Sequence, residues 1–117
     1  MINGINSREM ILEILLEIEE GEHSHVAIRN ALSKYQFLPK QDRAFITRVC
    51  EGTLEYRIQI DYIINSFSKV TVDKMKPAIR EILRSAVYQL KYMDSVPDSA
   101  VCNEAVKVAE RKGFYNL

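Results

Sequence analysis

The sequence predicts an all-α protein, a bundle of six helices followed by the start of a truncated seventh. Three observations support this fold class. Apolar residues recur at the three- and four-residue spacings of amphipathic helices through nearly the whole chain. No segment of useful length alternates between apolar and polar residues as a strand does. The connections between helical segments are short, and glycine or proline marks most of the boundaries.

The helix expected at residues 77–93 is the one around which the others are organised. Pro77 suits the first helical position, where its missing N–H costs nothing. The helical period gives this segment an apolar face and a positive stripe beside it. The face consists of Ile79, Ile82, Leu83, Ala86, Val87 and Leu90, and the stripe of Lys76, Arg80, Arg84 and Lys91. The face is expected to pack in the core, and the stripe indicates either an anionic partner or an ordinary solvated surface.

The first helix is expected at residues 7–20, with Asn6 and Glu9 at capping-box spacing and Gly21 as the left-handed residue that ends it. Glutamates line the side opposite its apolar stripe. They could form a general-acid site, but the sequence identifies no opposing group. A solvated surface is the simpler interpretation.

The second helix is expected at residues 25–34 with Ser24 as its N-cap, and the third at residues 40–56. Gly52 interrupts the third helix. A glycine in a helix interior costs roughly 1 kcal/mol relative to alanine. We therefore expect Gly52 to let another helix approach closely. A fourth helix follows almost at once, with apolar residues at helical spacing from residue 60 to residue 67.

The sixth helix is expected to start at Pro97 and Asp98, after the central helix, and to end at Gly113. The residues that follow resemble the opening of another amphipathic helix that the sequence does not complete: Phe114, Tyr115 and Leu117. We therefore interpret residues 1–117 as a single domain belonging to a longer protein.

Composition sets limits on location and partners. The 16 basic and 16 acidic side chains cancel, so net charge gives no long-range argument for binding nucleic acid or a membrane. Cys50 and Cys102 lie in apolar helical patterns, where small buried thiols are expected, and this suits a reducing cytoplasm. No apolar run approaches the roughly 20 residues of a membrane span, and the N-terminus does not resemble a signal peptide. A cytoplasmic protein with no membrane partner is expected.

Motifs that carry catalytic chemistry are missing from the sequence. It contains no glycine-rich phosphate loop and no nucleophile elbow. The pair His23 and His25 resembles half of a metal site, but no further ligand has a zinc-like spacing. No catalytic residue, metal ion or cofactor is therefore expected in this chain.

Several short motifs occur in a fixed order along the chain. They are Gly52-Thr53-Leu54, Ile82-Leu83-Arg84 with Tyr88-Gln89-Leu90, Val96-Pro97 and Asn103-Glu104-Ala105-Val106. Each is weak alone, but together their order and spacing resemble the NusB-like family of helical bundles. The opening Asp42-Arg43-Ala44-Phe45 looks more like the N-terminal domain of Sun/RsmB-type ribosomal RNA methyltransferases than the free-standing antitermination factor.

The resemblance implies an RNA-binding accessory domain that helps to position ribosomal RNA. In such enzymes a following catalytic domain uses S-adenosylmethionine to methylate carbon five of a cytosine, so that cofactor is expected outside this chain. The RNA-binding candidates are Arg8, Lys76, Arg80, Arg84 and Lys91. Arg84 matches a family position that has a structural alternative, an ion pair with Glu104.

Two other functions stay open. A NusB-type antitermination factor binds RNA together with a ribosomal protein, and the family does this through an arginine-rich N-terminal segment. Only Arg8-Glu9 matches that segment here, because Asn3, Gly4, Ile5 and Asn6 stand where basic residues are expected. The remaining alternative is a helical protein-interaction module with no RNA role.

Overall fold

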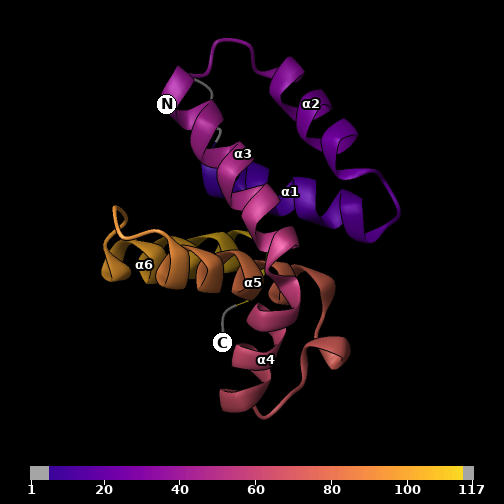
Figure 1. Ribbon diagram of the computed structural model, residues 1–117, viewed down its shortest axis with the longest axis vertical. Helices are drawn as coiled ribbons and strands as arrows, with labels where there is room; N and C mark the ends of the chain where they lie inside the picture. Colours follow the sequence, from indigo (N-terminus) through magenta and orange to yellow (C-terminus); the bar gives the residue numbers. More distant parts are fainter. Residues whose placement is uncertain (1–5, 115–117) are drawn as a thin grey trace.

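The computed structural model describes residues 6–114, which form six α-helices and one short 3-10 helix (Figure 1). The elements are α1 (Ser7–Glu19), α2 (Ser24–Lys34), α3 (Lys40–Glu55), α4 (Arg57–Phe67), η1 (Val72–Lys74), α5 (Pro77–Tyr92) and α6 (Asp98–Arg111). The predicted all-α class and the six helices are confirmed. The predicted opening of a seventh helix falls largely on residues 115–117, outside the described residues. Within 6–114, none of the helices combines the length and apolar character needed to cross a membrane.

The helix boundaries follow local signals. The Asn6 side chain accepts hydrogen bonds from two backbone N–H groups at the start of α1. Gly21 and Gly113 have φ values of 116° and 91°, so both predicted helix ends use the left-handed conformation that glycine tolerates. The predicted N-cap of α2 was wrong. Ser24 is the first helical residue, and His23 occupies the cap position without a side-chain hydrogen bond.

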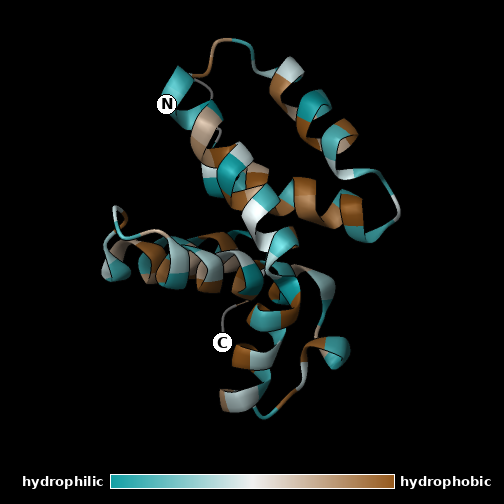
Figure 2. Ribbon diagram, in the orientation of Figure 1, coloured by the Kyte–Doolittle hydropathy of each residue, from teal (hydrophilic) through white to brown (hydrophobic). Residues whose placement is uncertain are grey.

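The core forms where α1 and α5 pack among the other helices. Each of these two contacts the other, α3 and α6, while α2 packs against α1 and α4 against α5. Apolar residues on one side of each helix supply this core, and hydrophilic residues cover the outer sides (Figure 2). Arg43 anchors the end of α2 to α3, because its Nη1 donates to the carbonyls of Leu32 and Tyr35, both at 3.1 Å.

A close contact between α3 and α5 lies at Gly52. A Cβ atom added there would overlap the end of the Tyr88 ring, so α3 and α5 approach at a distance that only glycine permits. This confirms the predicted close approach. Cys50, two residues earlier, is fully buried as predicted, and burial raises the pKa of its thiol.

Some residues that the pattern placed in the core lie on the surface. Cys102, predicted to be buried, is exposed. Phe67 and Val106 are 64% and 50% exposed, and Leu90 is 39% exposed. The helical period identifies an apolar face but does not say how much of that face a neighbouring helix covers. The described residues leave this part of the α4, α5 and α6 surface open.

Candidate nucleic-acid interface

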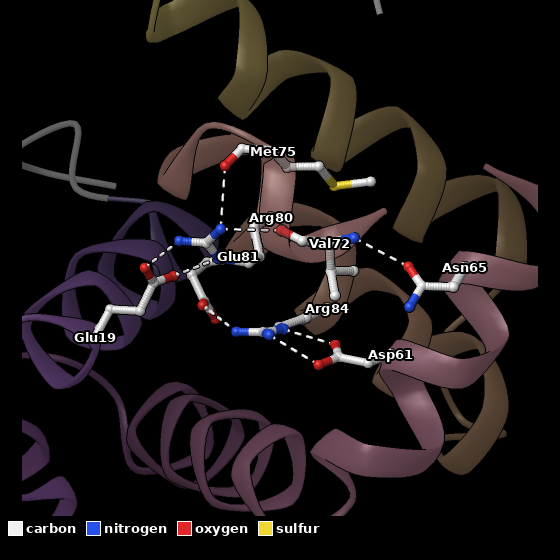
Figure 3. A network of polar contacts seen from close by, with 8 residues as sticks. All are labelled: Glu19, Asp61, Asn65, Val72, Met75, Arg80, Glu81 and Arg84. Carbon is white, nitrogen blue, oxygen red and sulfur yellow. Dashed lines mark hydrogen bonds and ion pairs between the residues drawn. The ribbon is translucent and has the colours of Figure 1, made fainter. Parts of the chain in front are cut away.

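Arg80, one of the predicted RNA contacts, is used to hold the fold together (Figure 3). Its guanidinium forms an ion pair with Glu19 of α1, with Nε donating at 3.0 Å. Its Nη1 donates to the backbone carbonyls of Val72 and Met75, at 2.9 and 3.1 Å. Asn65 fixes the same segment by accepting the Val72 N–H at 2.9 Å. Arg80 thus connects α1, η1 and α5.

Arg84 is also directed into the protein, one turn further along α5. Its guanidinium makes a bidentate pair with Asp61 of α4, with both N–O distances 2.8 Å, and Nη1 donates to Glu81 at 2.7 Å. Arg84 therefore forms structural ion pairs, as the alternative prediction held, but its partners are Asp61 and Glu81 and not Glu104. Glu104 instead accepts a hydrogen bond from Asn6 at 3.4 Å.

The guanidinium groups of these two arginines and three carboxyl groups form one cluster. The carboxyl groups belong to Glu19, Asp61 and Glu81. The cluster is neutral when one of the three carboxyl groups carries a proton. Burial and a hydrogen bond with Glu19 together raise the pKa of Glu81 to about 8, against the opposing effect of Arg84. Burial alone would raise the pKa of Glu19, but hydrogen bonds from Arg80 and Glu81 outweigh it and lower that pKa to about 2. Glu81 therefore carries the proton at neutral pH, and Glu19 is ionised.

Arg8 is half-buried at the start of α1. Its guanidinium carbon lies 5.1 Å from the centroid of the Phe45 ring, and Nη2 donates to Gln89 at 3.4 Å. Its Nε is buried without a hydrogen-bond partner among residues 6–114. Burial lowers the pKa of Arg8, against an opposing effect of Glu104. These contacts leave only part of the Arg8 side chain accessible to a ligand.

Lys76 and Lys91 are the two predicted contacts that are fully available on the surface. Both are exposed and neither forms an ion pair with a described residue. Their ammonium groups each lie 5.6 Å from an aromatic centroid, that of Phe114 for Lys76 and that of Tyr92 for Lys91. Fifteen residues separate them, about 22 Å along the helix axis. The predicted stripe is therefore interrupted where the arginines turn inward.

Other exposed cations extend the surface at each end of α5. Lys69 precedes η1 and Lys74 is its last residue, and both are close in sequence to Lys76. Near Lys91, Arg48 of α3 donates from Nη2 to the carbonyl of Tyr92 at 3.1 Å. Arg48 was not predicted, because no local spacing in the sequence connects α3 with the end of α5. We call Arg48 and Lys91, at the C-terminal end of α5, the α3–α5 cation pair.

Another part of the surface, between α1 and α2, is acidic. A groove of about 1040 Å³ lies between α1 and α2, and several of its lining residues are glutamates: Glu9, Glu13, Glu17, Glu20 and Glu22. Arg111, the last residue of α6, pairs with Glu9, and the following Lys112 pairs with Glu13. The glutamates of this groove repel phosphate, whereas exposed lysines lie at the two ends of α5. Within 6–114, no three His, Cys, Asp or Glu side chains are grouped as a metal ion would need.

Comparisons with curated proteins divide into two groups. The chain is 31% identical to the probable ribosomal RNA small subunit methyltransferase B of Bacillus subtilis over 110 residues, and 32% identical to that of Synechocystis over 114 residues. These matches cover 94% and 97% of this chain but only 24% and 25% of the relatives. The transcription antitermination protein NusB of Bacillus velezensis is 32% identical, over 92% of this chain and 80% of that protein.

Among solved structures, the fold matches a chain in the crystal structure of antitermination factors NusB and NusE in complex with dsRNA. The TM-score is 0.83, and the match covers 92% of this chain and 81% of that chain. At 16% sequence identity this likeness shows the fold alone. The sequence model of the NusB family matches residues 5–116, nearly the whole chain. On this evidence, the chain belongs to the NusB family.

Proposed function

We propose that this chain is the RNA-binding accessory domain of a small-subunit ribosomal RNA cytosine-5 methyltransferase. The observation that carries the proposal is its match, over nearly all its length, to about a quarter of each of two such methyltransferases. In this arrangement S-adenosylmethionine and the target cytosine are bound by a separate catalytic domain. The NusB-like domain supplies affinity for the RNA surrounding that cytosine.

The exposed cations at the two ends of α5 fit this role. Lys76 and Lys91 present ammonium groups that can contact phosphates, and such contacts position RNA without reading its sequence. Their separation of about 22 Å means that they contact different phosphates of one strand or helix. Arg80 and Arg84 support the surface indirectly, because they hold α5 against α1, α4 and η1.

The size of the native polypeptide tests the fused arrangement. We would detect it by antibody in the cells from which the sequence derives and measure its intact mass. A polypeptide roughly four times as long as this chain is expected, by analogy with the two methyltransferases. A product near 13.5 kDa would contradict the proposal.

A second candidate is an antitermination factor that binds RNA with a ribosomal protein. The observation in its favour is the match over 80% of the length of the Bacillus velezensis protein. This function requires a stable complex with a ribosomal protein. Co-purification of a ribosomal protein with a short native product would favour it over the methyltransferase role.

A further inference from the structure

A shallow hollow of about 570 Å³ lies on the outer side of α3, beside the α3–α5 cation pair. Its deepest residues are Gly52 of α3 and Tyr88 of α5, both buried. Exposed charged residues from successive turns of α3 line its edge: Lys40, Arg48, Glu51 and Glu55.

Tyr88 contributes a hydroxyl-bearing side chain to the lining of this hollow. Tyr88 is only 5% exposed, and its ring packs beside Tyr56 and Tyr92, with centroids 6.4 and 5.3 Å away. The hydroxyl forms no hydrogen bond with another residue in 6–114, but it is not among the buried side-chain atoms that lack a partner there. Because Gly52 has no side chain, the hydroxyl occupies the space beside the α3 backbone and borders the hollow.

The charged edge selects the kind of ligand. Lys40 has no ion pair with a described residue, and Arg48 uses one N–H on the Tyr92 carbonyl and keeps donors for a ligand. Glu51 and Glu55 offer carboxylate oxygens that only accept hydrogen bonds. A simple anion would be repelled by these two carboxylates. A ligand that carries both a phosphate and hydrogen-bond donors can pair with the two cations and with the two carboxylates of this edge.

We propose that this hollow binds one ribonucleotide of an RNA strand. The phosphate contacts Lys40 and Arg48, while Glu51 or Glu55 accepts a hydrogen bond from the ribose 2′-hydroxyl, the group that distinguishes RNA from DNA. The Tyr88 hydroxyl supplies the remaining polar contact. The inference rests on the proposed RNA-binding function and adds to it the place where one nucleotide is held.

The test uses the 117-residue chain with a 12-nucleotide oligouridine RNA and the matching deoxyuridine DNA. Fluorescence anisotropy measures affinity, and the backbone amide of Gly52, one of four glycines, reports contact by NMR. The Tyr88→Phe variant removes only the hydroxyl, and Tyr62→Phe on the exposed side of α4 is its matched control. A Glu55→Gln variant, at an exposed position, tests the carboxylate edge without touching the core.

We expect RNA, but not DNA, to shift the Gly52 amide. Tyr88→Phe should lower the RNA affinity roughly two- to ten-fold, as loss of one hydrogen bond does, with unchanged thermal stability. Glu55→Gln should reduce the preference for RNA over DNA, and Tyr62→Phe should bind like the wild type.

Three outcomes would overturn the inference. If RNA binds but does not shift the Gly52 amide resonance, or if Tyr88→Phe binds RNA like the wild type, the hollow is not the site. The RNA-binding function stands in that case. If uridine monophosphate saturates the Gly52 shift at lower concentration than the oligomer, the hollow serves free nucleotides. If the wild type binds no RNA at low salt, both this inference and the proposed function fail.

Discussion

Replacing Arg84 by methionine tests whether this residue is structural. Methionine retains most of the length and the apolar stem of arginine but removes the bidentate pair with Asp61 and the hydrogen bond to Glu81. The Arg84 and Asp61 side chains are only 10% and 22% exposed, so water replaces little of what is lost. The variant therefore leaves a carboxylate of α4 without its counter-charge.

Removing one member of a buried ion pair costs about 3–5 kcal/mol. The lower end of this range applies here, because Glu81 can hold a proton, its pKa already being raised to about 8. Only Asp61 then remains charged, and it is partly exposed. A chain of 117 residues has a total stability of about 6–18 kcal/mol. The loss is therefore a sixth to a half of the whole.

Urea unfolding followed by far-UV circular dichroism measures this loss. With a slope of about 2 kcal/mol per molar urea, a loss of 3 kcal/mol lowers the midpoint by about 1.5 M. Lys91→Met is the matched control, since it removes an exposed cation from the same helix and should change stability by less than about 0.5 kcal/mol. A loss below about 1 kcal/mol for Arg84→Met would refute the structural role.

Three further predictions use other parts of the fold. Gly52→Ala gains about 1 kcal/mol of helix propensity but forces a Cβ into the Tyr88 ring, at a cost of about 1–3 kcal/mol or more. We therefore expect the Tm to fall by several degrees. A higher Tm would show that α3 and α5 separate easily. Between about pH 5 and pH 8 the folded state keeps a proton on Glu81 that the unfolded chain has released, so the free energy of unfolding should fall as pH rises, by up to about 1.4 kcal/mol per pH unit. Glu81→Gln should flatten this fall, and an unchanged pH dependence of unfolding in urea would contradict the assignment. A thiol reagent should modify only Cys102 in the native protein and Cys50 as well after unfolding, and rapid native labelling of a Cys102→Ser variant would contradict the burial of Cys50.

Features that depend on neighbouring residues in the chain were predictable from the sequence. The Asn6 cap, Pro77 at the first position of α5 and the glycine that ends α6 all act within one turn of the residue concerned. Gly52 was predictable as a point of close approach, because glycine destabilises a helix interior and close packing against another helix can offset that cost. Its partner, Tyr88, was not predictable, because it comes from another helix and its position depends on the crossing geometry.

The site was less predictable because it depends on contacts between distant segments. The helical period predicts the cations of α5 on one side, but Arg80 and Arg84 turn inward to meet Glu19 of α1 and Asp61 of α4. Spacing within one helix cannot reveal such partners. Arg48 was missed for the same reason, since only folding brings α3 beside the end of α5.

The salt dependence of RNA binding tests the central claim most directly. We would titrate the chain with a single-stranded fragment of small-subunit ribosomal RNA over a series of salt concentrations, comparing the wild type with a Lys76→Ala/Lys91→Ala double variant. Lys107→Ala is the control, because its ammonium pairs with Glu104 on α6. The account predicts that the double variant lowers the log–log slope by about 1.4, or 0.7 for each lost phosphate contact, while the control leaves it unchanged. An equal slope in the double variant would contradict the assigned surface, and no binding at low salt would leave a helical protein-interaction module as the better account.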